Sequence, residues 1–370
     1  MFTPEATIWT TYPAGNTTSD PTSPTLNLTA QSIPLPLLSP LFPSVYCDPT
    51  STICQIITGE GEINAAVTLS ALLLSNQFDL RKTYILIAGI AGVSPEKGTL
   101  GSVAFSRYAV QVALQYEIDA REMVGGRGGY VAQGAKEVGE YPGSLYGTEV
   151  FELNDALRGV AAGFARKAVL SDSEKAKVYR ARYATNSSVE EGGLGKGLYA
   201  EGTKPPSVLE CDVATSDTYF SGKLLGEAFA TYTKLLTNGT GTYCMTAQED
   251  NSTLEALLRG HLAGLVDFAR IVVMRTASDM DRQYPGQSAE ENLFAFDEQG
   301  GFTPAIQNLY IAGIEVVRGI LGAWEERFEV GIPAGNYVGD ILGSIGGTPD
   351  FGPGVRTRKR RVGTRGVGYS

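Results

Sequence analysis

The chain has 370 residues, of which 43% are hydrophobic and 19% are charged, and its formal net charge is −10. This composition fits one large globular domain or two small ones with a sizeable core. The acidic excess argues against a general affinity for the nucleic acid backbone, which attracts basic surfaces. A membrane-spanning helix is not predicted, because Glu315 and Arg318 interrupt the best candidate, residues 309–324, before it reaches about 18 residues.

The amino-terminal residues predict little regular structure. Residues 1–9 contain one charged side chain, Glu5, and residues 10–46 are rich in Pro, Ser and Thr, which is typical of surface loops. Cys47 and Cys54 then bracket six residues, few enough for a small disulfide loop.

The segment after Cys54 predicts a strand, a turn, a helix and a second strand. Residues 56–57 end the first strand, two glycines within residues 58–61 permit a tight turn, and apolar residues then recur at helical spacing. Residues 84–88 form an apolar run typical of a strand covered on both faces. We expect this run to break into a loop at residues 89–92, where backbone can approach a ligand. The same glycines can also serve only as turns.

The rest of the chain alternates between predicted helices and strands. The helices are residues 149–168, 171–181, 222–237, 253–267 and 302–327, and the strands are residues 211–215, 242–245 and 269–275. Residues 125–146 and 184–206 are Gly-rich and predict irregular segments, the second a possible lid or a mere insertion. Residues 355–370 predict a basic, disordered tail.

The cysteines point to an oxidising compartment. Cys211 and Cys244 begin and end a segment whose two ends both look strand-like, so they could meet. Four cysteines allow three pairings, of which we favour Cys47–Cys54 with Cys211–Cys244; four reduced thiols are the alternative. Glycosylation sequons fit a secretory route leading outside the cell or to its surface, although no signal peptide is visible. These sequons lie at Asn16, Asn27, Asn186, Asn238 and Asn251.

Several segments resemble known proteins. ITGEGEINAA, YILIAGIAG and GTLGSVAFSRYAVQVALQYEID resemble the nucleoside phosphorylase and nucleosidase superfamily. YGTEVFELN, CDVATSDTYFSG, YCMTAQEDNSTLEALLRG, MRTASDMDR and GGTPDFGPG are similar to the fungal purine nucleoside permease (NUP) family. The resemblance implies one nucleoside-phosphorylase-like α/β domain over residues 1–354, with a twisted mixed sheet flanked by helices. MFTPEATIW resembles the family's segment directly after the first core strand, so we expect that strand and a signal segment to be missing from this sequence.

The resemblance also implies a chemistry. Cleaving a purine N-glycosidic bond needs an acid for N7 of the base, negative charge near the oxocarbenium-like ribosyl group, and a nucleophile on the opposite face. The resemblance makes Asp279 the acid, Glu249 the ligand of the ribose hydroxyls and Glu5 the residue that positions the attacking water. It places the substrate contacts at Gly89, Ile90, Ala91, Gly92, Tyr219, Phe220, Gln248, Asn251, Arg275 and Ser278.

Each of these residues also has an ordinary structural explanation. Asp279 could cap a helix, Glu249 could be a first-turn acid favoured by the helix dipole, and Glu5 could be a surface acid. Tyr219 and Phe220 could be a core pair. Asp250 and Glu255 compete with Glu249 for its role.

The nucleophile is expected to be water. Phosphorylases of the bacterial type bind phosphate with an Arg and a Ser or Thr at the positions of Ile87 and Ile90, and isoleucine cannot bond an oxyanion. We therefore favour an enzyme, a purine nucleosidase without cofactor or metal. A non-catalytic nucleoside transport or binding protein with a membrane-associated partner, and a phosphorylase, are the alternatives. A homo-oligomer is possible, and the sole histidine, His261, is not expected to act in catalysis.

Overall fold

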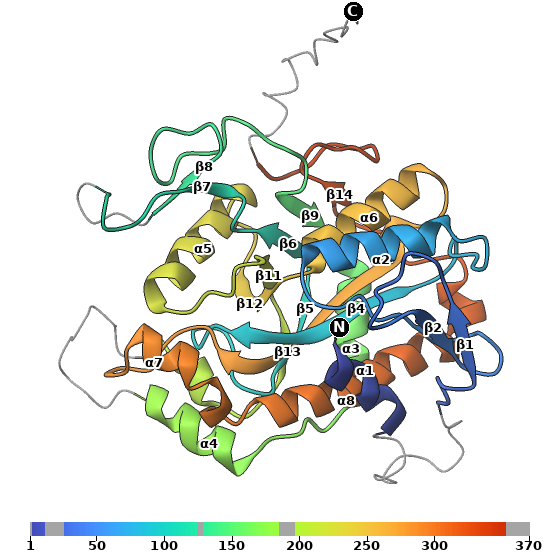
Figure 1. Cartoon of the computed structure of the whole chain (residues 1–370), viewed down its shortest axis with the longest axis horizontal. Coiled ribbons are helices and arrows are strands. Elements are labelled where there is room, and N and C mark those ends of the chain that lie inside the picture. The colour runs from blue at the N-terminus through green and yellow to red at the C-terminus, as the bar shows by residue number, and fades with distance from the viewer. Residues whose placement is uncertain (1, 12–25, 124–128, 185–196, 353–370) are drawn as a thin grey trace, which may run out of the picture.

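A nine-stranded mixed sheet forms the centre of the molecule in the computed structural model, which describes residues 2–11, 26–123, 129–184 and 197–352 (Figure 1). The predicted mixed sheet flanked by helices is thereby confirmed. Its strands, in spatial order, are β10 (Val208–Glu210), β5 (Val103–Ser106), β13 (Ile271–Met280), β4 (Ile85–Val93), β12 (Tyr243–Ala247), β11 (Asp212–Thr215), β6 (Tyr108–Gln111), β9 (Val150–Glu152) and β14 (Gly339–Asp340).

Helices cover both faces of this sheet. Helices α3 (Asp155–Ala165) and α8 (Phe302–Gly322) pack on one face, and α2 (Glu62–Leu74) and α6 (Asp250–Leu262) pack on the other, as the lower and upper helices in Figure 1. Because successive strand residues point to opposite faces, Met274 of β13 joins the apolar cluster of α3 and α8, whereas its neighbour Val273 joins that of α2 and α6.

Smaller elements surround the sheet. A third apolar cluster packs α5 (Lys223–Leu236) against β6 and β11. The other helices are α1 (Thr3–Thr11), α4 (Glu174–Arg180) and α7 (Ala289–Phe294), and the short helical turns are Ala181–Tyr183, Glu201–Thr203, Phe268–Arg270, Phe296–Glu298 and Trp324–Phe328. Two minor sheets comprise β1 (Gln31–Pro34), β2 (Ser44–Cys47) and β3 (Cys54–Gln55), and β7 (Gln115–Glu117) and β8 (Tyr130–Ala132).

The predicted break in β4 is wrong. The strand continues through residues 89–92 to Val93, because it pairs in parallel with β13 from Ile85–Ile271 to Val93–Met280. Neither Gly89 nor Gly92 has a positive φ, so these glycines are not turn residues. They leave room for side chains that cross the strand at the pocket described below.

Several predicted boundaries also shift. Strand β13 ends at Met280 and not near residue 275, and α6 starts at Asp250 and ends at Leu262, before Gly264 with φ of +72°. Helix α8 ends at Gly322. Strands β1 and β2 lie where surface loop was predicted, and α1 forms at the amino terminus. The predicted lid (residues 184–206) lies partly, and the predicted tail wholly, outside the described residues.

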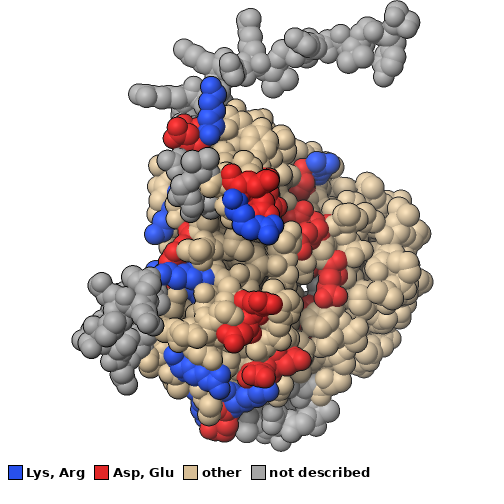
Figure 2. Space-filling view, turned by 60° about the vertical axis from the view of Figure 1, so that its left-hand side comes forward, with Lys and Arg blue, Asp and Glu red and all other residues tan. Residues whose placement is uncertain are grey.

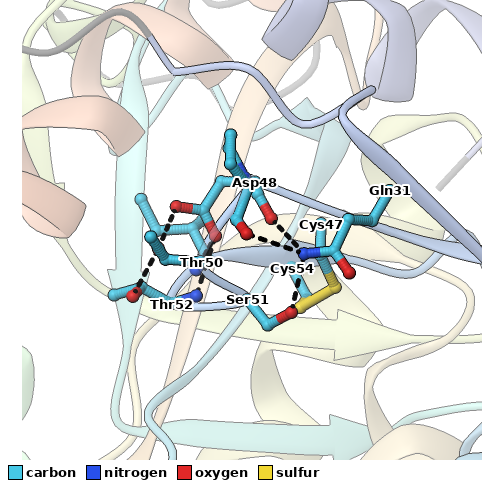
Figure 3. The surroundings of a disulfide bond; sticks show 9 residues. Gln31, Cys47, Asp48, Thr50, Ser51, Thr52 and Cys54 are labelled. Carbon is cyan, nitrogen blue, oxygen red and sulfur yellow. Dashed lines mark hydrogen bonds between the residues drawn. A yellow bond between two sulfur atoms is a disulfide. The ribbon is translucent and has the colours of Figure 1, made fainter.

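Both predicted disulfides are confirmed. Cys47–Cys54 closes the β2–β3 hairpin and Cys211–Cys244 ties the start of β11 to β12. Figure 3 shows how the turn beside the first bridge is held: the Gln31 side-chain amide donates to the Asp48 carbonyl at 2.8 Å and to Ser51 Oγ at 3.0 Å. Asp48 in turn accepts the backbone N–H of Thr52 at 2.7 Å.

A large cavity borders β4. On the edge of β4 away from β13, the described strands pair only at Val93–Met245. An apolar cavity of about 740 Å³ adjoins the earlier part of this edge, and its walls include Leu86, Leu72 of α2 and Ile320 of α8. The cavity is therefore bounded by helices from both faces of the sheet.

The surface carries charges of both signs. On the face shown in Figure 2, acidic and basic side chains of the described residues lie side by side, next to a broad uncharged area. No helix in the described part of the chain is long and apolar enough to cross a bilayer.

Candidate functional site

A pocket of about 310 Å³ lies where β4, β11, β12 and β13 end. Its volume falls within the range typical of small-molecule sites, about 300–1,000 Å³. It is lined by Phe2, Glu5, Glu60, Ile90, Ala91, Gly92, Ser216, Thr218, Tyr219, Phe220, Thr246, Ala247, Gln248, Glu249, Arg275, Ser278, Asp279, Phe296 and Phe302.

Arg275 is the charged centre of this pocket. Its side chain is buried and crosses β4 at Gly89, where an added Cβ would overlap the Arg275 Nη1 atom and lie 2.9 Å from Glu5 Oε1. The guanidinium donates to Asp250 and, at 3.3 Å, to Glu249 Oε2. Gly89 is thus a glycine because the arginine needs its space.

Glu249 is held from two sides. Its Oε2 accepts from Arg275 and its Oε1 accepts the backbone N–H of Gly61 at 3.0 Å, just before α2. Burial raises the pKa of Glu249, but the Arg275 charge, together with smaller contributions that include the Gly61 N–H, outweighs burial, so the pKa lies below the ordinary value. Glu249 is therefore a fixed carboxylate in the pocket.

Glu5 enters the pocket from α1. Its Oε1 accepts the backbone N–H of Ile90 at 2.6 Å, and its Oε2 accepts the N–H of Phe2 at 2.8 Å. Glu5 is only 3% exposed. The alternative that it is a surface acid is therefore wrong.

Asp279 is a buried carboxyl on β13. The strand register shifts between Ala277 and Asp279, so the consecutive residues Ser278 and Asp279 both line the pocket. Ser278 Oγ donates to Asp279 Oδ1 at 2.7 Å, and the Tyr219 hydroxyl donates to Oδ2 at 2.9 Å. Because Asp279 lies within a strand, the alternative that it caps a helix is wrong.

The surroundings of Asp279 favour its protonated form. Burial raises the pKa of Asp279 above its ordinary value, the hydroxyls of Ser278 and Tyr219 lower it, and the negative charge of Asp281 raises it again. The net direction is upward. A carboxyl that retains its proton more readily than usual suits a general acid.

Most of the predicted site residues meet in this pocket. Gly89 underlies it without lining it, and Asn251 points elsewhere. The Asn251 side chain is buried, accepting from Thr215 Oγ1 at 2.6 Å and donating to the Thr148 carbonyl at 2.7 Å. This placement also removes Asn251 as a glycan acceptor in the folded protein, whereas the sequon residues Asn27 and Asn238 are exposed.

The two competitors of Glu249 and the sole histidine have other partners. Asp250 is fully buried and holds Arg275, Glu255 pairs with Arg259 on the outside of α6, and His261 accepts the N–H of Phe268. Asp250 therefore supports the site from behind, and the other two residues lie outside the pocket.

The sequence did not indicate the aromatic wall of the pocket, which Phe2, Phe296 and Phe302 form. Phe302 starts α8 and lies with its ring centroid 6.4 Å from that of Phe2 and 6.3 Å from that of Phe296. These three aromatic residues line the pocket, but Phe2 is distant in sequence from the other two and no motif connects them. Thr246, which accepts the Gly92 N–H at 2.8 Å, was also missed.

The comparisons with known proteins identify the family. A family model described as purine nucleoside permease (NUP) matches residues 1–333. The chain belongs to this family. A purine nucleoside permease of Candida albicans is 44% identical over 329 residues, covering 87% of this chain and 77% of the relative. A probable purine nucleoside permease of Schizosaccharomyces pombe is 38% identical over 308 residues, covering 80% of this chain and 84% of the relative.

Solved structures of similar shape are more distant from this NUP chain. They include a futalosine hydrolase of Helicobacter pylori at 14% identity and TM-score 0.48, covering 85% of this chain and 94% of that one. A 5′-methylthioadenosine/S-adenosylhomocysteine nucleosidase from the same organism also has 14% identity and TM-score 0.48, with 86% and 95% covered. These likenesses are too remote to assign an activity.

Proposed function

We propose that this NUP protein binds purine nucleosides in the pocket and hydrolyses their N-glycosidic bond. The observation that carries the proposal is Asp279, a buried carboxyl with a raised pKa that faces the same pocket as the fixed carboxylates Glu249 and Glu5. A carboxyl that holds its proton more readily than usual, beside anionic groups, suits the departure of a neutral purine from a cationic ribosyl group.

Each carboxyl has a distinct role in this mechanism. Asp279 donates its proton to N7 as the bond between base and ribose breaks. Glu249 accepts hydrogen bonds from the ribose hydroxyls and stabilises the positive charge on the sugar ring. Glu5 accepts a proton from the water that attacks the anomeric carbon. The products are the free base and ribose.

The charges in the pocket favour water over phosphate. Of the charged residues that line the pocket in the described structure, four are acids and one, Arg275, is a cation already held by Glu249 and Asp250. A phosphate dianion would meet uncompensated negative charge here. Ile90 also lines the pocket where an oxyanion-binding hydroxyl would be needed.

Product analysis tests the proposal. With inosine as substrate, we expect hypoxanthine and free ribose at a rate indifferent to added phosphate. Ribose 1-phosphate as the main product would replace hydrolysis by phosphorolysis. Tight nucleoside binding without any product would favour the second candidate function.

The second candidate is a non-catalytic binding protein for nucleoside transport. It is favoured by the family, whose relatives are named as permeases. In this case the pocket would hold the nucleoside for a membrane-associated partner and Asp279 would serve only to bind N7. Binding and turnover measurements on the same preparation distinguish the two functions.

We further propose that the protein works in the secretory pathway, outside the cell or at its surface. The two disulfides support this location, since such bridges persist in oxidising compartments. Localisation of a tagged full-length protein in the source organism tests this proposal, and a reduced cytosolic pool would contradict it.

Replacing Asp279 tests the mechanism directly. Asp279→Asn keeps the size and most hydrogen bonds but removes the transferable proton, so turnover of inosine should fall by about 10²–10⁴ with little change in binding. The loss should be smaller for a nitrophenyl riboside, whose leaving group needs no protonation. Asp267→Asn, which changes an acid outside the pocket, serves as the control. Equal loss on both substrates would mean that Asp279 is structural.

A further inference from the structure

Tyr219 occupies a distinctive place in the pocket. Tyr219 is 55% exposed, yet its hydroxyl donates to the carboxyl of Asp279, which is buried and only 6% exposed. The other donor to that carboxyl, Ser278, is itself buried and lies on the same strand. Tyr219 is therefore the hydrogen-bond donor to Asp279 that comes from outside the sheet.

The loop that carries Tyr219 is fixed at both ends. The N–H of Ser216 donates to the Ala247 carbonyl on β12 at 2.9 Å, and the N–H of Gly222 donates to the Asp281 carbonyl beyond β13 at 2.8 Å. Between them, the ring of Phe220 packs against Phe229 of α5 with the centroids 4.7 Å apart. The tyrosine hydroxyl is thus presented to Asp279 by anchored backbone.

The strand beneath Asp279 leaves room for this contact. An added Cβ at Gly92 would lie 3.1 Å from Asp279 Oδ2, the oxygen that accepts from Tyr219, and 2.9 Å from Thr246 Oγ1. Both oxygens of the carboxyl therefore have a defined place, Oδ1 against Ser278 and Oδ2 between Gly92 and Tyr219.

We propose that Tyr219 is a positioning residue for Asp279, which holds the carboxyl through its hydroxyl and determines the upper pH limit of the reaction. The inference rests on the proposed function and deepens it. A hydroxyl that donates to a carboxylate stabilises the ionised form. Without that donor, Asp279 would keep its proton to higher pH.

Other charges near Asp279 stay in place when the hydroxyl is removed. These charges contribute equally to the pKa of Asp279 in the wild type and in a variant that lacks the Tyr219 hydroxyl. The difference in pKa between the two proteins therefore reports on that hydroxyl. The charged groups that face the pocket or adjoin Asp279 are Glu5 on α1, Glu60 before α2, Glu249 after β12, and Arg275 and Asp281 on and beside β13.

Tyr219→Phe is the decisive variant, because it keeps the ring as a wall of the pocket and removes only the hydroxyl. We expect the basic limb of kcat/KM against pH for inosine to move upward by roughly 0.5–1 pH unit, with little change in KM. Tyr108→Phe, which removes a buried hydroxyl bonded to Thr240, should leave the profile where it is. An unchanged or downward-shifted limb in Tyr219→Phe would overturn the proposal.

A second measurement does not depend on turnover. The carboxyl carbon of Asp279 in ¹³C-labelled protein, assigned with Asp279→Asn, should titrate at higher pH in Tyr219→Phe than in the wild type. Equal titration curves would overturn the role of Tyr219 even in an active enzyme. Absence of hydrolysis by the wild type would instead refute the proposed function, while the titration would still decide whether Tyr219 controls Asp279.

Discussion

At the scale of single residues, the site depends on contacts between side chains and glycine backbone. The motif formed by Arg275, Ser278 and Asp279 could be recognised in the sequence because the three residues are close together on one strand. The partner of Arg275 could not, because the carboxylate of Asp250 becomes its partner only when α6 packs beside β13. Three-dimensional packing also turned Asn251 away from the pocket.

Gly89 offers the first residue-scale prediction. In Gly89→Ala the new Cβ would displace the Arg275 guanidinium and crowd Glu5, so we expect a loss of roughly 1–3 kcal/mol of unfolding free energy together with loss of nucleoside binding. Gly159→Ala is the matched control, because a Cβ there meets nothing within 4 Å on helix α3 and should stabilise by about 0.5–1 kcal/mol. Urea unfolding measures both. Normal nucleoside affinity in Gly89→Ala would contradict the crossing of Arg275 over Gly89.

Glu152 on β9 offers a second residue-scale prediction, which concerns how stability depends on pH. Its Oε1 accepts from Arg107 and Asn336, but its buried Oε2 has no partner among the described residues. Burial raises the pKa of Glu152 from 4.5 to about 7, against the lowering by Asn336 and Arg107. Because the folded state then binds this proton more tightly than the unfolded state, stability falls as pH rises from 4.5 to 7.

The variant Glu152→Gln has no such proton to lose. Relative to the wild type, its unfolding free energy should rise by up to about 3 kcal/mol between pH 5 and pH 8, whatever its constant offset. Urea unfolding across this range measures the difference. Glu174→Gln, which changes an exposed acid on α4, is the control and shows how the loss of any glutamate alters the dependence on pH. A flat difference for Glu152→Gln would show that Glu152 is ionised throughout.

At the scale of elements, the hydrophobic pattern predicted which segments form helices and strands more reliably than it predicted where those elements end. The apolar runs of β4 and β13 were found, but the last residues of β4 were assigned to a loop because the glycines of residues 89–92 suggested a turn. Pairing between the two strands overrides this local preference over their whole length. Helix α1 was missed, because its buried face consists of Glu5, Ala6 and Trp9 and gives no apolar periodicity.

Helix α2 shows a second effect of tertiary structure on an element. The residue before its first turn provides no side-chain cap. Instead, the backbone N–H of Gly61 donates to Glu249, and the backbone N–H of Glu62 donates to Asp217 Oδ1 at 2.8 Å. Two carboxylates at a helix amino terminus also suit the helix dipole. The start of α2 is therefore coupled to the pocket.

Asp217→Ala should show this coupling. Loss of the cap should lower the unfolding free energy by about 1 kcal/mol and weaken nucleoside binding, because Asp217 precedes Thr218 and Tyr219 of the pocket wall. Ser288→Ala removes a local cap from α7, where the Ser288 hydroxyl accepts the Glu291 N–H at 3.0 Å, and should destabilise without affecting binding. Calorimetric unfolding and nucleoside titration of both variants distinguish a coupled cap from a local one.

At the scale of the whole molecule, covalent links join regions of very different character. The Cys47–Cys54 bridge holds a small peripheral sheet, whose Gln55 side chain donates to the Ala6 carbonyl of α1 at 3.2 Å. The Cys211–Cys244 bridge lies inside the central sheet and joins the strands whose ends carry Tyr219 and Glu249. The first bridge thus supports the helix of Glu5, and the second supports the floor of the pocket.

The two bridges should differ in stabilising effect and in accessibility. They close loops of sequence separation 7 and 33, for which loop entropy gives about 2 and about 4 kcal/mol. Cys54 is exposed, whereas Cys211 and Cys244 are buried, so mild reductant should open Cys47–Cys54 first in the folded protein. The paired variants Cys47→Ala/Cys54→Ala and Cys211→Ala/Cys244→Ala measure each contribution by urea unfolding, and the second pair should lose more unfolding free energy.

Mass spectrometry after partial reduction and alkylation gives the order in which the two bridges open. Four free thiols in the native protein, or a larger loss from the first pair, would contradict this division between a peripheral and a central bridge.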